Sequence, residues 1–145
     1  MKANALLLAG LLAAAAGCCC IGAGSGTWED DPANYRRAWG EDKPADVDLV
    51  HSWYWRSPHF TREEAYFFQF RKHAQWPQAF VAANDMAPAV SGPAGLKPDL
   101  PPFEKPAWFL PKPLDAYDAW SGPRASAWLF VDKESGDTFI CAYSL

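Results

Sequence analysis

The densest group of side chains capable of chemistry lies between residues 51 and 64. It contains two histidines, two serines and two glutamates: His51, Ser52, Ser57, His59, Glu63 and Glu64. A general base needs hydrogen-bond reach to its proton, and zinc needs three or four converging ligands. The spacing matches neither HExxH nor another motif with a known ligand geometry. We therefore expect structural roles here, with a small hydrolase or metalloprotein using His51, His59 and Glu63 or Glu64 as the alternative.

Other catalytic arrangements have less support. No serine lies in a GxSxG elbow. The chain contains the residue types for a catalytic triad of Cys141, His73 and Asp137, but nothing in the local sequence favours one. No cysteine and histidine spacing is typical of a structural zinc site. We predict a protein that is not an enzyme and that has no metal or cofactor.

Tryptophan is the stronger indication of function, because the chain contains eight. Indole rings can bind sugars and peptides and can form protein hot spots. The candidate binding residues are Trp53, Trp55 and Trp108, together with His51 and His59. The competing interpretation is that these rings only pack in the core.

Two segments around these residues predict strands. Residues 47–56 alternate, with Val47, Leu49, His51, Trp53 and Trp55 expected on one face. Residues 61–72 carry a capping-box pattern for a helix, but their consecutive aromatics favour a strand that pairs with the first. A polar turn at 132–137 between β-rich runs 127–131 and 138–144 predicts a hairpin.

Helices are predicted at two places. Asp31-Pro32 is a helix start, with Gly40 as its end. Trp76-Pro77 opens a second short helix through Ala83. Residues 114–120 are expected to form a helical turn or more, and 25–31 a short tether.

Residues 86–113, which we call the arm, contain eight prolines. This density excludes a helix and a central strand. Phe103, Trp108, Phe109 and Leu110 are costly to expose, so the second half of the arm should lie against the sheet. The predicted fold is α+β: an antiparallel sheet of about four strands, with short helices and the arm covering one face, in a single globular domain over residues 28–145.

The N-terminus has the features of an export signal. Lys2 is followed by an apolar stretch from Ala3 to Ala16, and small residues precede Cys18. Ala15-Ala16-Gly17-Cys18 resembles the lipobox of bacterial lipoprotein signals, although leucine is commoner at its first position. The resemblance implies a signal peptide at 1–17, diacylglycerol on Cys18 and a tether at 18–27.

Several outcomes for this leader stay open: an uncleaved anchor, cleavage without lipid, or lipidation at Cys19 or Cys20. Lipidation would place the protein on the periplasmic face of a bacterial membrane. Because Cys19 stands where inner-membrane retention uses Asp, the outer membrane is favoured. Cys141 is expected to be a small buried residue, with a disulfide to the tether as the alternative.

Charge limits the partners further. Without Lys2, the exported part carries 12 basic and 17 acidic residues, a net charge of −5. No basic run suits a phosphate backbone, so we expect no nucleic-acid binding. The expected function is a lipid-anchored envelope module that binds a protein or peptidoglycan. An immunity protein and a purely structural lipoprotein are the other possibilities.

The lipid prediction can be tested directly. Radiolabelled palmitate should enter the wild-type protein and should fail to enter a Cys18→Ala variant, because the thiol is the acceptor. Mass spectrometry of the purified protein should show a diacylated N-terminal cysteine. An unmodified thiol at Cys18 would refute the prediction.

Overall fold

A long aromatic hairpin forms the centre of the molecule. The computed structural model describes residues 24–61, 63–90, 95–123 and 126–145. Strand β2 (Leu49–Arg56) pairs antiparallel with β3 (Glu64–Phe70). Both predicted strands are confirmed, over somewhat shorter ranges. The aromatics of β3 favour a strand over a helix because a pleated surface lets consecutive rings pack on opposite faces.

The predicted C-terminal hairpin is also confirmed. Strand β6 (Ala127–Asp132) pairs with β7 (Thr138–Ser144), and β7 pairs in turn with β3. Gly136 closes the turn with a positive φ of 78°. A Cβ there would lie 2.9 Å from the side chain of Lys72, so glycine satisfies both the backbone angle and the close packing.

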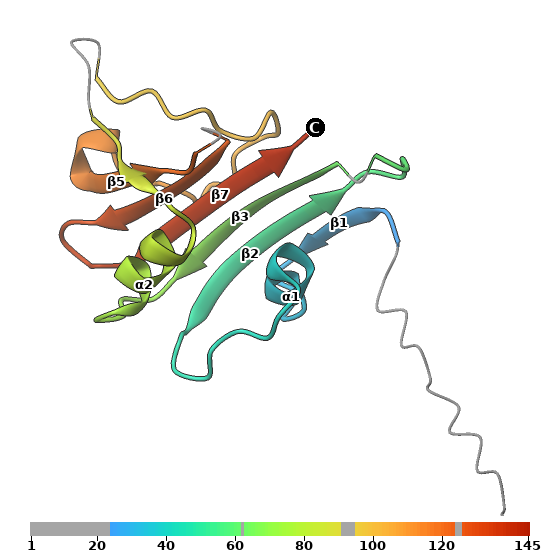
Figure 1. Cartoon of the computed structure of the whole chain (residues 1–145), viewed down its shortest axis with the longest axis horizontal. Helices are drawn as coiled ribbons and strands as arrows, with labels where there is room; N and C mark the ends of the chain where they lie inside the picture. The colour runs from blue at the N-terminus through green and yellow to red at the C-terminus, as the bar shows by residue number, and fades with distance from the viewer. Residues whose placement is uncertain (1–23, 62, 91–94, 124–125) are drawn as a thin grey trace, which may run out of the picture.

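The sheet is larger than the sequence predicts. The described residues form a seven-stranded antiparallel sheet in the order β1-β2-β3-β7-β6-β5-β4 (Figure 1). The added strands are β1 (Gly26–Glu29), β4 (Ala87–Pro88) and β5 (Tyr117–Ser121). Since the described residues add only two short α-helices to this sheet, the fold is β-rich. The prediction of an α+β fold with about four strands is wrong.

The missed strands are short and lie toward the two edges. β1 occupies part of the predicted tether, while β5 replaces most of the helix expected at 114–120. Only Leu114–Ala116, labelled η1, makes a helical turn there, of the 3₁₀ type. β1 is defined by backbone bonds to β2, which begins about 20 residues later, and β5 by backbone bonds to β6, the next strand in the chain. Strands this short have little periodicity of their own, so a local pattern does not reveal them.

Both predicted helices are present. Helix α1 (Asn34–Trp39) ends at Gly40, whose φ of 76° allows its N–H to donate to the Arg36 carbonyl. The Asp31 carboxylate accepts the Ala33 N–H at 2.8 Å just before the helix. Helix α2 (Trp76–Ala83) carries Pro77 in its first turn and ends before Asn84.

The two faces of the sheet are covered by different parts of the chain. Both helices lie in front of the sheet in Figure 1. They pack on a helix-face cluster: Tyr35, Val47, Phe68, Phe70, Trp76, Met86, Leu129 and Ile140. The arm packs on an arm-face cluster: Phe67, Phe109, Leu110, Tyr117, Trp128, Phe130, Phe139 and Cys141. The prediction that helices and arm cover one face is therefore wrong.

Phe109 is the centre of the arm's contact with the sheet. Its side chain is fully buried. Its ring centroid lies 4.9 Å from that of Phe67 and 5.8 Å from that of Phe139, in edge-to-face geometry. The expectation that the second half of the arm lies against the sheet is confirmed.

Cys141 lies in the same cluster as a fully buried free thiol. Burial raises its pKa, because the apolar surroundings disfavour a thiolate. The expectation of a small buried residue is confirmed. The predicted signal peptide at 1–17 and the residues Cys18, Cys19 and Cys20 lie outside the described residues.

The contribution of Phe109 to the free energy of unfolding can be measured. Phe109→Ala should lower the free energy of unfolding by about 3–5 kcal/mol, because it removes a buried ring and leaves a cavity. The exposed residue Val90 supplies the control: Val90→Ala should change stability by less than about 0.5 kcal/mol. Urea denaturation followed by fluorescence measures both. Equal stabilities for the two variants would contradict the packing described above.

Candidate functional site

A half-open cleft of about 530 Å³ lies between the β1–β2 pair and the arm. We call it the arm cleft. Its walls combine aromatic rings with carboxylates. The lining residues are Glu29, Asp30, Ser52, Trp53, Phe103, Glu104, Lys105, Pro106, Ala107 and Trp108.

A β-bulge in β2 determines which of its residues reach this cleft. Leu49 pairs with Phe70, while His51 pairs with the next β3 residue, Gln69, so Val50 is an extra residue. An extra residue shifts the alternation of side chains between the two faces. Leu49 therefore packs on the helix-face cluster and Trp53 on the arm-face cluster. The prediction that residues 47–55 present one continuous face is wrong.

Asp30 links the end of β1 to β2. Its φ of 47° lies in the left-handed region, which short polar residues tolerate better than most. Its backbone N–H donates to the Ser52 carbonyl at 2.7 Å, and its carboxylate accepts the Ser52 N–H at 2.9 Å. Both carboxylate oxygens also lie 3.2 Å from Nδ1 of His51. Asp30 thus orients the imidazole.

Rings from the arm complete the site. Trp108 stacks on His51, with centroids 5.3 Å apart and planes inclined by 21°. The ring centroid of Phe103 lies 5.4 Å from that of Trp53 and 4.8 Å from that of Trp55. All five rings are half-buried. The structure therefore brings together four of the five predicted binding residues: His51, Trp53, Trp55 and Trp108.

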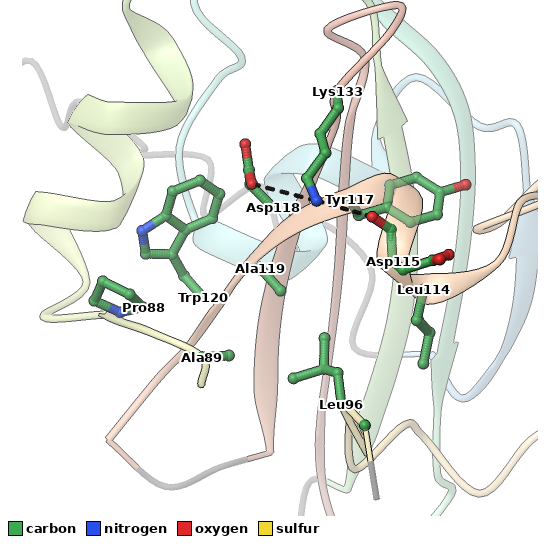
Figure 2. A pocket seen from close by; sticks show the side chains of 11 residues that line it. Pro88, Ala89, Leu96, Leu114, Asp115, Tyr117, Asp118, Ala119, Trp120 and Lys133 are labelled. Atoms are coloured by element: carbon green, nitrogen blue, oxygen red, sulfur yellow. Dashed lines mark hydrogen bonds and ion pairs between the residues drawn. The ribbon is translucent and has the colours of Figure 1, made fainter. Parts of the chain in front are cut away.

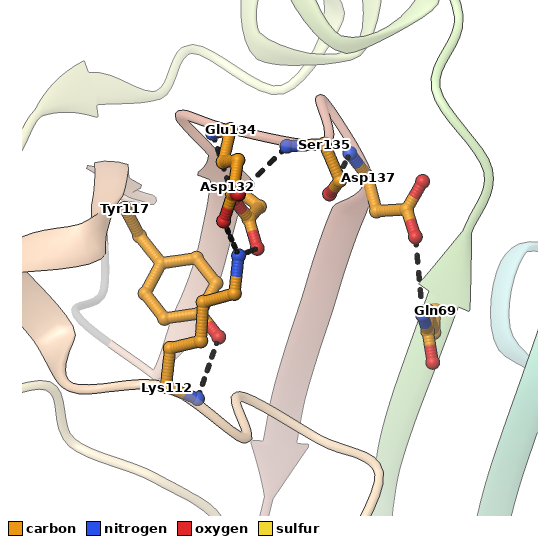
Figure 3. Close-up of polar contacts among 7 residues, drawn as sticks. All are labelled: Gln69, Lys112, Tyr117, Asp132, Glu134, Ser135 and Asp137. Carbon is orange, nitrogen blue, oxygen red and sulfur yellow. Dashed lines mark hydrogen bonds and ion pairs between the residues drawn. The ribbon is translucent and has the colours of Figure 1, made fainter.

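A buried carboxylate holds the end of the arm in place (Figure 3). Nζ of Lys112 lies 2.8 Å from Asp132 and 2.7 Å from Glu134. The backbone N–H of Lys112 donates to the Tyr117 hydroxyl at 3.1 Å. Asp132 also accepts the N–H groups of Glu134 and Ser135 in the β6–β7 turn. One carboxylate therefore joins the arm to this turn.

The ion pair shifts the pKa values of both partners. The Lys112 ammonium lowers the pKa of Asp132, and the turn N–H groups add to this effect against the opposing desolvation. The Asp132 and Glu134 carboxylates raise the pKa of Lys112. Both shifts favour the charged forms, so the pair stabilises the folded state while both groups are ionised.

The fifth predicted binding residue, His59, lies elsewhere. It is exposed in the loop between β2 and β3. β2 continues for five residues beyond His51, which places the loop about 17 Å from His51 along the strand. The structure therefore does not bring His51 and His59 together. Among the described residues, no group of three or more His, Cys, Asp or Glu side chains is placed to hold a metal.

The two glutamates of the segment have other partners. Glu63 accepts a hydrogen bond from the Thr61 hydroxyl at 3.2 Å. Glu64 accepts one from the Tyr54 hydroxyl at 2.7 Å and lies 3.7 Å from Arg56. Burial, together with the Glu64 carboxylate, raises the pKa of Tyr54 to about 12. These contacts hold the end of the hairpin together and lie away from His51.

The side chains of Cys141, His73 and Asp137 do not come together as a catalytic triad. Cys141 is buried in the arm-face cluster. His73 lies 3.3 Å from Asp46, and its ring accepts the Trp76 N–H at the start of α2. Asp137 accepts the Lys72 N–H at 3.1 Å. The last two contacts are to backbone N–H groups and are structural.

Asp30 and Glu29 are the site residues that sequence reasoning missed. Glu29 ends a strand of only four residues and Asp30 follows it, in a segment whose composition is typical of a tether. The Asp30-Asp31-Pro32 run was visible, but it indicates a helix start and not a partner for a histidine 21 positions later. Only the β1–β2 pairing reveals that contact.

A second cavity, of about 780 Å³, lies between β5 and the first half of the arm (Figure 2). Trp120, Leu96 and Leu114 contribute apolar walls. Its cation, Lys133, donates to the Asp115 carbonyl at 2.8 Å and lies 3.9 Å from Asp118. Its aromatic lining residues are two, Tyr117 and Trp120, against three in the arm cleft, Trp53, Phe103 and Trp108, so the arm cleft is the better candidate site.

Comparison with protein-family models, curated proteins and solved structures finds no match to the chain. Within the described ranges, no helix has the length and apolar character required to cross a bilayer. The assignment of function therefore depends on the geometry of the site.

The Lys112–Asp132 pair generates a pH-dependent prediction. Lys112→Met should lower the free energy of unfolding at pH 7, because Asp132 stays buried without its partner. The lowered pKa of Asp132 means that the wild-type advantage is present above pH 4 and is lost as the pH falls through the folded-state pKa. Urea titrations from pH 7 to pH 2.5 measure this difference. A wild-type advantage that persists unchanged at the lowest pH would exclude the pair as its origin.

Proposed function

We propose that this protein is a non-enzymatic, lipid-anchored binding protein of the bacterial envelope, and that its arm cleft binds cell-wall glycan. The observation that carries the proposal is the convergence of three half-buried rings, Trp53, Phe103 and Trp108, from two segments about 50 positions apart. Rings buried only for stability would not need to line an open cleft. Their arrangement beside carboxylates is typical of a binding site.

The chemistry of the cleft suits an amino-sugar chain with peptide stems. The faces of indole and phenyl rings can pack on the C–H faces of a pyranose. The carboxylates of Glu29, Asp30 and Glu104 can accept hydrogen bonds from hydroxyl, amide or amino groups. A polyanionic ligand would meet three carboxylates and is disfavoured.

The contacts of the polar residues favour binding over catalysis. The Ser52 hydroxyl is buried and accepts a hydrogen bond from the Asn34 amide at 3.0 Å, so it is not presented as a nucleophile. His51 is held by Asp30 on one side and stacked by Trp108. Both contacts fix the ring against residues that line the cleft.

Location is a separate part of the proposal. It depends on the resemblance of residues 15–18 to a lipobox, which implies acyl chains on Cys18. Two or three chains give durable attachment, whereas a single chain gives only weak attachment. We propose the periplasmic face of the outer membrane as the site of action, with membrane lipid as the first partner.

A hydrolase that uses His51 is the second candidate, because a carboxylate within 3.2 Å of Nδ1 can orient an imidazole as a general base. Incubation with purified cell-wall sacculi separates the two functions. Binding without release of soluble fragments supports the first. Release that is abolished by His51→Ala would replace it with the second.

The binding proposal predicts that Trp108→Ala weakens sedimentation with sacculi at least tenfold, a loss of about 1.4 kcal/mol. Trp120→Ala is the matched control, because Trp120 is also a half-buried indole but lines the other cavity. It should bind like the wild type. Circular dichroism checks that both variants are folded.

Other outcomes redirect the proposal. Loss of binding in the Trp120 variant alone would move the site to the second cavity. Failure of the wild type to sediment with sacculi, combined with capture of one envelope protein by chemical crosslinking, would favour a protein partner instead.

A further inference from the structure

We infer that the end of the sheet at which β1 begins lies on the lipid surface, with Phe60 inserted into the bilayer. This inference depends on the proposed lipid anchor at Cys18. It adds a second membrane contact, supplied by the folded part of the protein, and an orientation for the arm cleft.

The first observation is the position of Phe60. It lies in the loop between β2 and β3, flanked by Pro58, His59 and Thr61, all of which are exposed. The described residues include three large apolar side chains that are exposed: Phe60, Val90 and Leu145. The most exposed of them is Phe60, at 111% of its reference area. A fully exposed ring at a loop tip contributes nothing to packing within the chain, so its burial elsewhere would be a net gain.

The second observation is where the chain enters the sheet. Gly26, the first residue of β1, pairs with Arg56, the last residue of β2. The loop that carries Phe60 follows directly after Arg56. Glu64, the first residue of β3, pairs with Ser144 near the end of β7, which brings exposed Leu145 to the same end. Figure 1 shows the start of β1, the β2–β3 loop and the C-terminus at one end of the sheet.

Chain length then limits the distance to the bilayer. Cys18 and Gly26 are eight positions apart. A fully extended chain covers at most about 3.6 Å per residue, so Gly26 can lie no more than about 29 Å from an acylated Cys18. The loop beside Gly26 is held at the same surface. An anchored chain keeps the local concentration of lipid high. Even the modest affinity of one phenylalanine ring for the bilayer is then enough to hold the ring there.

The charges of this end favour insertion over electrostatic attraction. Glu64 is compensated by Arg56 and by the Tyr54 hydroxyl. In the sequence Arg62 stands next to Glu63, so these two residues give the loop that carries Phe60 no net charge. The chain as a whole is acidic. Contact with the bilayer should therefore depend on the apolar ring and be insensitive to salt.

This orientation places the Asp30 end of the arm cleft farther from the membrane than its Phe103 end, where Phe103 packs on Trp55. Asp30 follows the last residue of β1, at the opposite end from Gly26, and His51 lies near the start of β2. With the Gly26 end on the lipid, the Asp30 end of the cleft and the neighbouring His51 lie farther from the bilayer, toward the cell wall.

The test uses full-length, lipidated protein in vesicles of phosphatidylethanolamine and phosphatidylglycerol. A photoreactive phenylalanine analogue is placed at position 60 or, as the control, at position 90. Val90 is also exposed, but it follows β4 at the far edge of the sheet. On illumination, position 60 should crosslink to lipid at least fivefold more than position 90, at both low and high salt.

The outcomes separate this inference from the proposed function. If the protein is not acylated and stays out of the vesicle fraction, the proposed anchor fails first. If it is acylated and bound but positions 60 and 90 label lipid equally, the anchor stands and the inference fails. In whole envelopes, a crosslink from position 60 mainly to a protein would also overturn the inference, because Phe60 would then contact a protein and not lipid.

Discussion

The structure depends on a sheet whose two faces must both be kept from water. Consecutive aromatics in β3 place Phe68 on the helices and Phe67 against the arm. Helices can cover one face because they satisfy their own backbone hydrogen bonds. The arm cannot, since its prolines prevent a regular ladder, so it is held by ring packing at Phe109 and by the Lys112–Asp132 contact. This manner of covering the second face creates the arm cleft, because an irregular segment does not close over the sheet uniformly.

The cleft shows how structural and binding roles share residues. Asp30 ends β1, pairs with the backbone of β2 and orients His51 with the same carboxylate. Trp108 stacks on His51 and lines the cleft beside Phe109, which is entirely buried. Each ring in the cleft is supported from behind by a packed neighbour. Such a site is pre-organised, so ligand binding would cost little ordering of side chains.

The proposed anchor and the proposed cleft fit one arrangement. The chain from Cys18 enters the sheet at Gly26, while the polar part of the cleft lies near Asp30, at the other end of β1. A lipid-bound protein oriented by Phe60 would present the Asp30 end of its cleft outward. The acidic surface is compatible with this arrangement, because neither proposed contact relies on attraction between opposite charges. A short tether suits a protein whose ligand is a fixed layer near the membrane.

The sequence by itself determined the elements whose signals are local. Alternating aromatics predicted β2 and β3, a polar loop with Gly136 predicted the β6–β7 hairpin, and capping residues predicted both helices. The density of prolines excluded regular structure in most of the arm. Tertiary structure decided the rest: strands β1, β4 and β5, the bulge at Val50, the separation of His51 from His59, and the contacts of His51 with Asp30 and Trp108. Most of these features depend on partners between about 20 and 60 positions away in the chain, whereas β5 pairs with β6, the next strand along. No periodicity within a short segment records which distant strand or ring will lie beside it.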